Sequence, residues 1–110
     1  VENTRGLHID TTTKEYKAFM LLSEVNGDAD GPYCYVPSSN RRLCSSILNI
    51  LFNKIFDPEA TLTNISFCQD QDALKILGEP GDVILSDQRG VHRGWPQGKK
   101  GSRKMLVNVL

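Results

Sequence analysis

Residues 16–36 read YKAFMLLSEVNGDADGPYCYV, and this stretch decides the fold class. Its two ends, 16–25 and 33–36, are rich in the aromatic and branched residues that favour β-strands. The segment between them, 26–31, is rich in Asn, Asp and Gly, which favour turns. Together they predict a β-hairpin over 16–36 that Pro37 ends. A helix over 16–25 is the less favoured alternative, because no capping residue precedes it.

The rest of the chain continues this pattern of short strands separated by turn residues. Apolar side chains at three- and four-residue spacing predict one inserted helix, over 41–56. Several short strands and one helix are typical of an antiparallel sandwich or barrel. A complete eight-stranded jelly roll needs about one more strand than the sequence offers, so we expect a piece of a larger domain. The further predicted strands are 5–10, 61–67 (weak), 73–77, 82–86 and 105–110.

Length and composition place the chain among ordinary soluble domains. Its 110 residues predict a single, partial domain over 1–110. With 13 basic and 13 acidic residues, the net charge of zero indicates neither nucleic acid nor a membrane surface as a partner. No apolar run approaches the roughly 20 residues of a spanning helix. The three cysteines form no CxxC pair, so we expect small buried side chains in a reducing, cytoplasmic location. The sequence does not indicate the oligomeric state.

Both histidines lie in informative contexts. His8 and Asp10 are two residues apart in a predicted strand, so their side chains project from the same face. Iron(II) in oxygenases commonly takes two imidazoles and one carboxylate, with the opposite positions open. The second imidazole must then come from His92, because the chain has only two histidines. Taken one at a time, each is better explained as an ordinary hydrogen-bonded histidine.

Arg103 follows His92 by eleven residues, and 94–101 between them is rich in turn residues. We expect His92 to end one strand and Arg103 to begin its antiparallel neighbour. The planar guanidinium would then reach the metal cavity and bind the far carboxylate of a dicarboxylic keto-acid with two hydrogen bonds. The alternative is a solvated surface charge within the basic run Lys99, Lys100, Arg103 and Lys104.

In order and spacing these landmarks resemble the phytanoyl-CoA dioxygenase-like branch of the 2-oxoglutarate oxygenases. The resemblance implies a double-stranded β-helix, also called a jelly roll or cupin-like fold. It implies iron(II) held by His8, Asp10 and His92, with Arg103 binding the cosubstrate 2-oxoglutarate. It also implies O2 as oxidant, succinate and CO2 as products, and hydroxylation of a small organic substrate. The matching segments are 8–10, 31–41, 81–85, 87–94 and Arg103.

Some positions depart from the family pattern or refine it. Residues 38–40 read Ser-Ser-Asn where the family often has Gly-Ser-His, and Gly94 stands where relatives often have a serine that contacts the cosubstrate. Halogenating relatives have a small residue at the position of Asp10, so a carboxylate there favours hydroxylation.

Three other functions remain open. The first is a non-catalytic jelly-roll domain that binds a small molecule and retains a vestigial metal site. The second is a cupin-like metal enzyme that uses no keto-acid, although such sites usually take three histidines and a glutamate. The third is a structural interaction domain in which the histidines and Asp10 are incidental.

Several other side chains have a functional and a structural interpretation. Tyr33 and Tyr35 share a strand face and either line the cosubstrate pocket or pack the core. Trp95 either covers the substrate site or packs a turn. Asp87 either accepts a hydrogen bond from His92 or belongs to a turn. Lys17 is expected to be a strand-edge lysine in water rather than an inward-pointing one.

Overall fold

The computed structural model describes residues 6–11, 14–41, 51, 55, 68–98 and 103–110. This part of the chain is mainly β and contains no long helix. None of its helices is long and apolar enough to cross a membrane. Three single-turn 3-10 helices are η1 (Asp28–Asp30), η2 (Ser39–Arg41) and η3 (Asp70–Asp72). The strands are β1 (Tyr16–Leu21), β2 (Tyr33–Tyr35), β3 (Leu74–Ile76), β4 (Val83–Asp87), β5 (His92–Gly94) and β6 (Met105–Val109).

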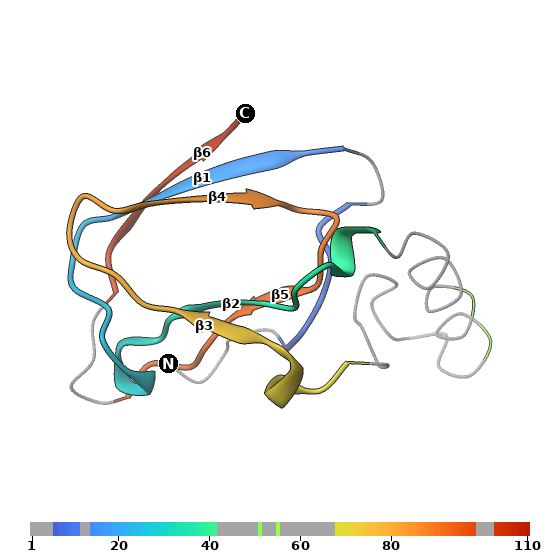
Figure 1. Cartoon of the computed structure of the whole chain (residues 1–110), viewed down its shortest axis with the longest axis horizontal. Helices are drawn as coiled ribbons and strands as arrows, with labels where there is room; N and C mark the ends of the chain where they lie inside the picture. Colours follow the sequence, from blue (N-terminus) through green and yellow to red (C-terminus); the bar gives the residue numbers. More distant parts are fainter. Residues whose placement is uncertain (1–5, 12–13, 42–50, 52–54, 56–67, 99–102) are drawn as a thin grey trace.

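The strands form two antiparallel sheets that face each other (Figure 1). One sheet has the order β4-β1-β6 and the other has the order β3-β2-β5. The chain moves between the two sheets at nearly every step, from β1 to β2, from β3 to β4, from β4 to β5 and from β5 to β6. Residues far apart in the sequence therefore meet between the sheets.

The predicted hairpin over 16–36 is wrong, and so is the alternative helix over 16–25. β1 and β2 lie in different sheets, and each pairs with other strands. After β1 the chain leaves its sheet, and Val25 exchanges two backbone hydrogen bonds of 2.9 Å with Gly78. The turn residues over 26–31 thus belong to a crossing from one sheet to the other, which uses the same residue types as a hairpin turn.

Other predicted elements agree with the structure more closely. The strands predicted over 73–77, 82–86 and 105–110 correspond to β3, β4 and β6. The strand predicted over 5–10 is reduced to a single bridge between His8 and His92. The predicted helix over 41–56 and the weak strand over 61–67 lie outside the described residues, except for Arg41, Leu51 and Ile55.

A small apolar cluster holds the N-terminal segment against the turn before β5. Leu7, Ile9, Val36 and Val91 pack together, and each is at most 7% exposed. Burying side chains of this size stabilises the fold by about 1.5–3 kcal/mol each. Because Leu7 and Ile9 alternate with His8 and Asp10, this cluster fixes the side from which the two polar residues project.

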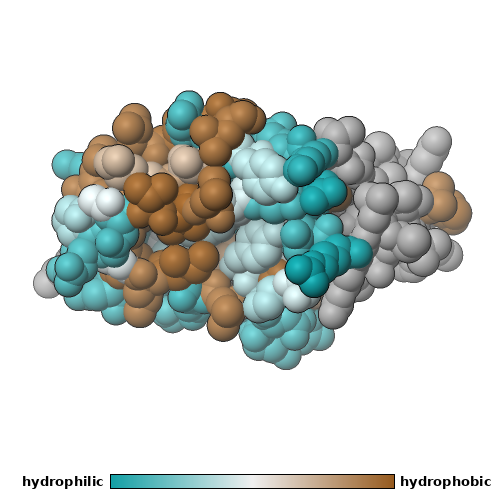
Figure 2. Space-filling view, turned by 45° about the horizontal axis from the view of Figure 1, so that its top comes forward, coloured by the Kyte–Doolittle hydropathy of each residue, from teal (hydrophilic) through white to brown (hydrophobic). Residues whose placement is uncertain are grey.

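The sheet β4-β1-β6 has an apolar outer face as well as an apolar inner face. Met20, Val83, Leu85 and Leu106 are between 38% and 67% exposed, and the strand register places Met20 beside Val83 and Leu106. Figure 2 shows brown, hydrophobic atoms gathered on this face. Both faces of β1 are therefore largely apolar, which affects how far its orientation can be predicted from the sequence.

Candidate metal centre

Backbone pairing brings the two histidines and Asp10 together. His8 and His92 face each other directly, because each backbone N–H donates to the other's carbonyl at 3.0 and 2.9 Å. Two residues later, the Asp10 N–H donates to the Gln88 carbonyl at 3.2 Å. The N-terminal segment thus runs antiparallel to the chain just before and within β5. This pairing gathers side chains that are more than eighty residues apart in the sequence.

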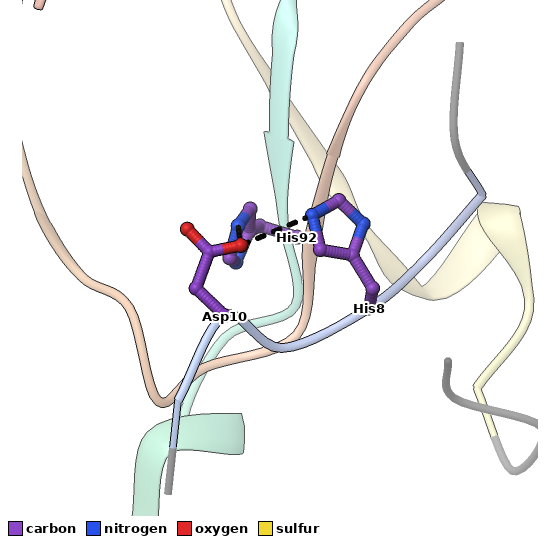
Figure 3. A group of neighbouring side chains, drawn as sticks. All are labelled: His8, Asp10 and His92. Atoms are coloured by element: carbon purple, nitrogen blue, oxygen red, sulfur yellow. Dashed lines mark ion pairs between the residues drawn. The ribbon is translucent and has the colours of Figure 1, made fainter. Parts of the chain in front are cut away.

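The predicted ligand residues meet at one point (Figure 3). Asp10 Oδ1 lies 3.4 Å from His8 Nε2 and 3.5 Å from His92 Nε2. One potential ligand atom from each of the three residues lies within 4.8 Å of the others. Neighbouring ligands on an octahedral ion with bonds of about 2.1 Å are about 3.0 Å apart, so each carboxylate–imidazole pair is within about 0.5 Å of that spacing.

Each imidazole is oriented by a backbone carbonyl. His8 Nδ1 lies 2.7 Å from the Gly6 carbonyl oxygen, and His92 Nδ1 lies 2.8 Å from that of Gly90. A carbonyl oxygen only accepts hydrogen bonds, so Nδ1 carries the proton in each ring. In the neutral ring, Nε2 then holds a lone pair that points toward Asp10. This carbonyl–imidazole arrangement is the one that commonly orients metal-binding histidines.

The protonation states suit a cation. Burial lowers the pKa of His92, which is 4% exposed, so its imidazole is neutral near pH 7. Burial alone would raise the pKa of Asp10, but the Lys17 hydrogen bond and nearby positive charge outweigh it, and the pKa is lowered. Asp10 is therefore an anion. Two imidazole lone pairs and a carboxylate converging on one point fit a divalent first-row metal ion.

Arg103 and the candidate ligand His92 both lie close to Tyr33. The Tyr33 ring is 5.7 Å from the His92 ring, and Tyr33 and Arg103 both line a cavity of about 320 Å³ between the sheets. The guanidinium donates to the Gly31 carbonyl and packs against Gly94. Arg103 is partly buried, and this burial lowers its pKa. It is therefore not a solvated surface charge.

The expected strand arrangement around Arg103 is wrong, although its side chain does point between the sheets. His92 begins β5 instead of ending a strand, and Arg103 precedes β6. β5 pairs with β2 whereas β6 pairs with β1, so the two strands are not neighbours. The chain therefore changes sheets between β5 and β6.

Asp87 and Trp95 each had a functional and a structural interpretation, and the structure shows what each side chain contacts. Asp87 does not contact His92. Its carboxylate instead accepts hydrogen bonds from Arg89 and Asn40. The hydrogen bonds from Arg89 lower the pKa of Asp87 to about 2. Trp95 packs beneath the Lys75 ammonium, 4.0 Å from the ring centre.

Tyr33 and Tyr35 both line a second cavity, of about 410 Å³, at the edge between β3 and β4. The space between the sheets can therefore be reached from two sides, and Tyr33 borders both cavities.

Two features of the site were missed by sequence reasoning. Lys17 points inward and donates to Asp10 Oδ2 at 2.8 Å, so the expected strand-edge lysine in water is wrong. A buried polar group also lies beside Tyr33. The Tyr33 hydroxyl is 2.8 Å from Ser86 Oγ, and Gln88 is 1% exposed with no hydrogen-bond partner for Oε1 among the described residues. The two-residue spacing of Ser86 and Gln88 places their side chains on one face of an extended segment. This spacing could have indicated the buried polar group from the sequence.

Comparisons with protein-family models, with curated proteins and with solved structures found no significant match to this chain.

Proposed function

We propose that this protein is an Fe(II)- and 2-oxoglutarate-dependent dioxygenase that hydroxylates a small organic substrate. The observation that carries the proposal is the meeting of His8, Asp10 and His92 at one point, with both imidazole Nε2 atoms directed at one carboxylate oxygen. Two imidazoles and one carboxylate leave room on an iron ion for a cosubstrate and O2. The resemblance to the phytanoyl-CoA dioxygenase-like family is part of the same proposal.

The architecture supports a double-stranded β-helix for this chain. In such a fold, consecutive strands alternate between two facing antiparallel sheets, and here most steps along the chain change sheets. The proposed metal ligands lie between the sheets, on the segment that pairs with β5 and on β5 itself. We propose that these sheets form a partial jelly roll.

Each proposed ligand has a distinct part in the reaction. His8 and His92 provide neutral nitrogen ligands held in place by the carbonyls of Gly6 and Gly90, and Asp10 provides one negative charge. When bound, the iron with 2-oxoglutarate and O2 supplies the oxidation, in which the keto-acid becomes succinate and CO2 and one oxygen atom enters a substrate C–H bond. The protein holds the reactants in place and limits water around them.

Arg103 is the proposed anchor for the far carboxylate of 2-oxoglutarate. The cavity that it lines also contains Phe19, Tyr33, Met105 and Val107. A single cation among apolar side chains suits a linear dicarboxylate whose middle is a short hydrocarbon chain. To bind it, the guanidinium exchanges its bond with the Gly31 carbonyl for bonds with the carboxylate.

The decisive test is succinate release by the protein supplied with Fe(II), 2-oxoglutarate and ascorbate, followed across a panel of small metabolites. We expect Asp10→Ala to lose turnover, because the site then lacks its only anionic ligand. The matched control is Asp28→Ala, which removes an exposed carboxylate paired with Lys75 and should keep turnover. Unchanged turnover in Asp10→Ala would remove Asp10 from the ligand set.

One observation favours a second candidate, a non-catalytic binding domain with a vestigial metal site. The Arg103 guanidinium already has a partner in the Gly31 carbonyl, and Gly94 offers no hydroxyl beside it. In that case metal binds, but neither free 2-oxoglutarate nor any substrate in the panel leads to succinate.

A further inference from the structure

Lys17 lies in the central strand of its sheet and points toward the sheet opposite. It alternates with Ala18, and its inward face continues through Phe19 and Leu21, which are 9% and 2% exposed. Its direct partner on β4 is Ser86, which is 5% exposed. Only 24% of the Lys17 side chain is exposed. A lysine in such a position normally has a specific anionic partner.

That partner is the outer oxygen of the proposed metal ligand. Lys17 Nζ lies 2.8 Å from Asp10 Oδ2, whereas the two histidine Nε2 atoms lie 3.4 and 3.5 Å from Oδ1. The two oxygens of one carboxylate therefore have separate partners. Oδ1 faces the metal-binding point, and Oδ2 is engaged by an ammonium. A charge-assisted hydrogen bond of this length is among the stronger ones in proteins.

We propose that Lys17 is a positioning residue that makes Asp10 a one-oxygen ligand. The inference rests on the proposed metal centre. Carboxylates bind metal ions through either one or both oxygens. If Asp10 bound through both, the second oxygen would fill a position on the ion that the cosubstrate or O2 needs. By engaging Oδ2, Lys17 keeps that position open.

The same geometry predicts an electrostatic cost. The ammonium stands near the metal position, and like charges at such short range repel each other even under partial solvent screening. Lys17 should therefore weaken metal binding while it keeps the position open. Loss of Lys17 should raise metal affinity and reduce the number of water molecules on the metal. A residue with a merely structural role would give the opposite sign, because its loss would loosen the site.

The test uses Mn²⁺, whose bound water is counted by water-proton relaxation. In Lys17→Met, which keeps the apolar stem, we expect the relaxation enhancement to fall by about a third, as when one of roughly three open positions on an octahedral ion is filled. Mn²⁺ affinity should rise on the order of tenfold. Lys17→Arg, which can still donate to Oδ2, should restore wild-type relaxation. Lys14→Met, which removes an exposed lysine of the same strand region, is the charge control.

The outcomes separate this inference from the proposed function. If the wild-type protein binds no Mn²⁺, the metal centre itself fails. If the wild type binds Mn²⁺ and Lys17→Met shows the same relaxation enhancement, Lys17 does not position Asp10. If Lys17→Met does not fold, Lys17→Arg still decides. Since Arg keeps the charge and the hydrogen bond, reduced relaxation in folded Lys17→Arg overturns the inference and wild-type relaxation supports it.

Discussion

Substituting Gly90 with alanine should destabilise the fold and weaken the proposed metal centre together. A Cβ atom at position 90 would lie 1.8 Å from Tyr35 Oη and 2.2 Å from Tyr35 Cζ. These distances are far shorter than any contact between unbonded atoms, so either the ring or the turn before β5 must move. Moving the ring breaks a contact, because Tyr35, which pairs in β2 with His92 of β5, donates its hydroxyl proton to the Asp87 carbonyl at 3.0 Å.

The expected cost follows from these contacts. Forcing an extra methyl group against the Tyr35 ring costs about 1–3 kcal/mol, and losing the bond from Tyr35 to the Asp87 carbonyl costs about 1 kcal/mol. We therefore expect Gly90→Ala to lower the free energy of unfolding by about 2–4 kcal/mol, a large part of the 5–15 kcal/mol typical of a domain. Because the Gly90 carbonyl orients His92, metal affinity should fall on the order of 10–100-fold.

Urea unfolding followed by circular dichroism measures the first effect, and a Co²⁺ titration followed by visible absorption measures the second. Gly27→Ala is the matched control, because Gly27 has an extended backbone with φ −172° and no atom within 4 Å of an added Cβ. It should stay within about 0.5 kcal/mol of wild type. Adding Tyr35→Ala to Gly90→Ala should recover part of the loss. A Gly90→Ala variant as stable as Gly27→Ala would show that the Tyr35 ring does not confine position 90.

Two further predictions concern single charged residues. Arg103→Ala should raise the 2-oxoglutarate concentration needed for half-maximal binding on the order of 10–100-fold, because a charge-assisted bond is lost. The affinity for Mn²⁺ should stay the same. Equal 2-oxoglutarate affinity in the wild type and the variant would refute the anchor role. Asp87→Asn should flatten the acid side of the stability profile. The Arg89 hydrogen bonds lower the pKa of Asp87 from 3.8 to about 2. This shift stabilises the folded wild type by about 1–2 kcal/mol above pH 3.8, and the contribution is lost as pH falls toward 2. Urea unfolding of both proteins between pH 2 and 6 measures it, and parallel profiles would contradict it.

Most of the strands could be located from the sequence, but their partners could not; β5, which begins at His92, was not predicted. β4 and β6 were predictable because the apolar runs at 83–85 and 105–107 follow clear turn signals. The pairing of β1 was not, because the turn residues over 26–31 fit a hairpin and a crossing between sheets equally well. The choice depends on where the chain leaves β1, and the contacts that fix it, such as the bridge from Val25 to Gly78, join distant segments.

Within the site, the proposed metal ligands were more predictable than their partners. Strand periodicity placed His8 and Asp10 on one face, and His92 followed because no other histidine exists. Lys17 was not predictable, because both faces of β1 carry apolar side chains and a lysine is normally assigned to water. The structure places Met20 on the outside and Lys17 on the inside. Phe19 and Leu21 are buried on the same side as Lys17, and Asp10 gives the lysine an anionic partner there.

The most direct measurement is anaerobic visible absorption of the protein titrated with Fe(II) and then with 2-oxoglutarate. We expect a weak charge-transfer band that appears only when both are present, because it arises from the keto-acid bound to iron at the three ligands. The band should be absent in Asp10→Ala and present in Asp28→Ala. A wild-type protein that binds Fe(II) but gives no band with saturating 2-oxoglutarate would contradict the proposed function.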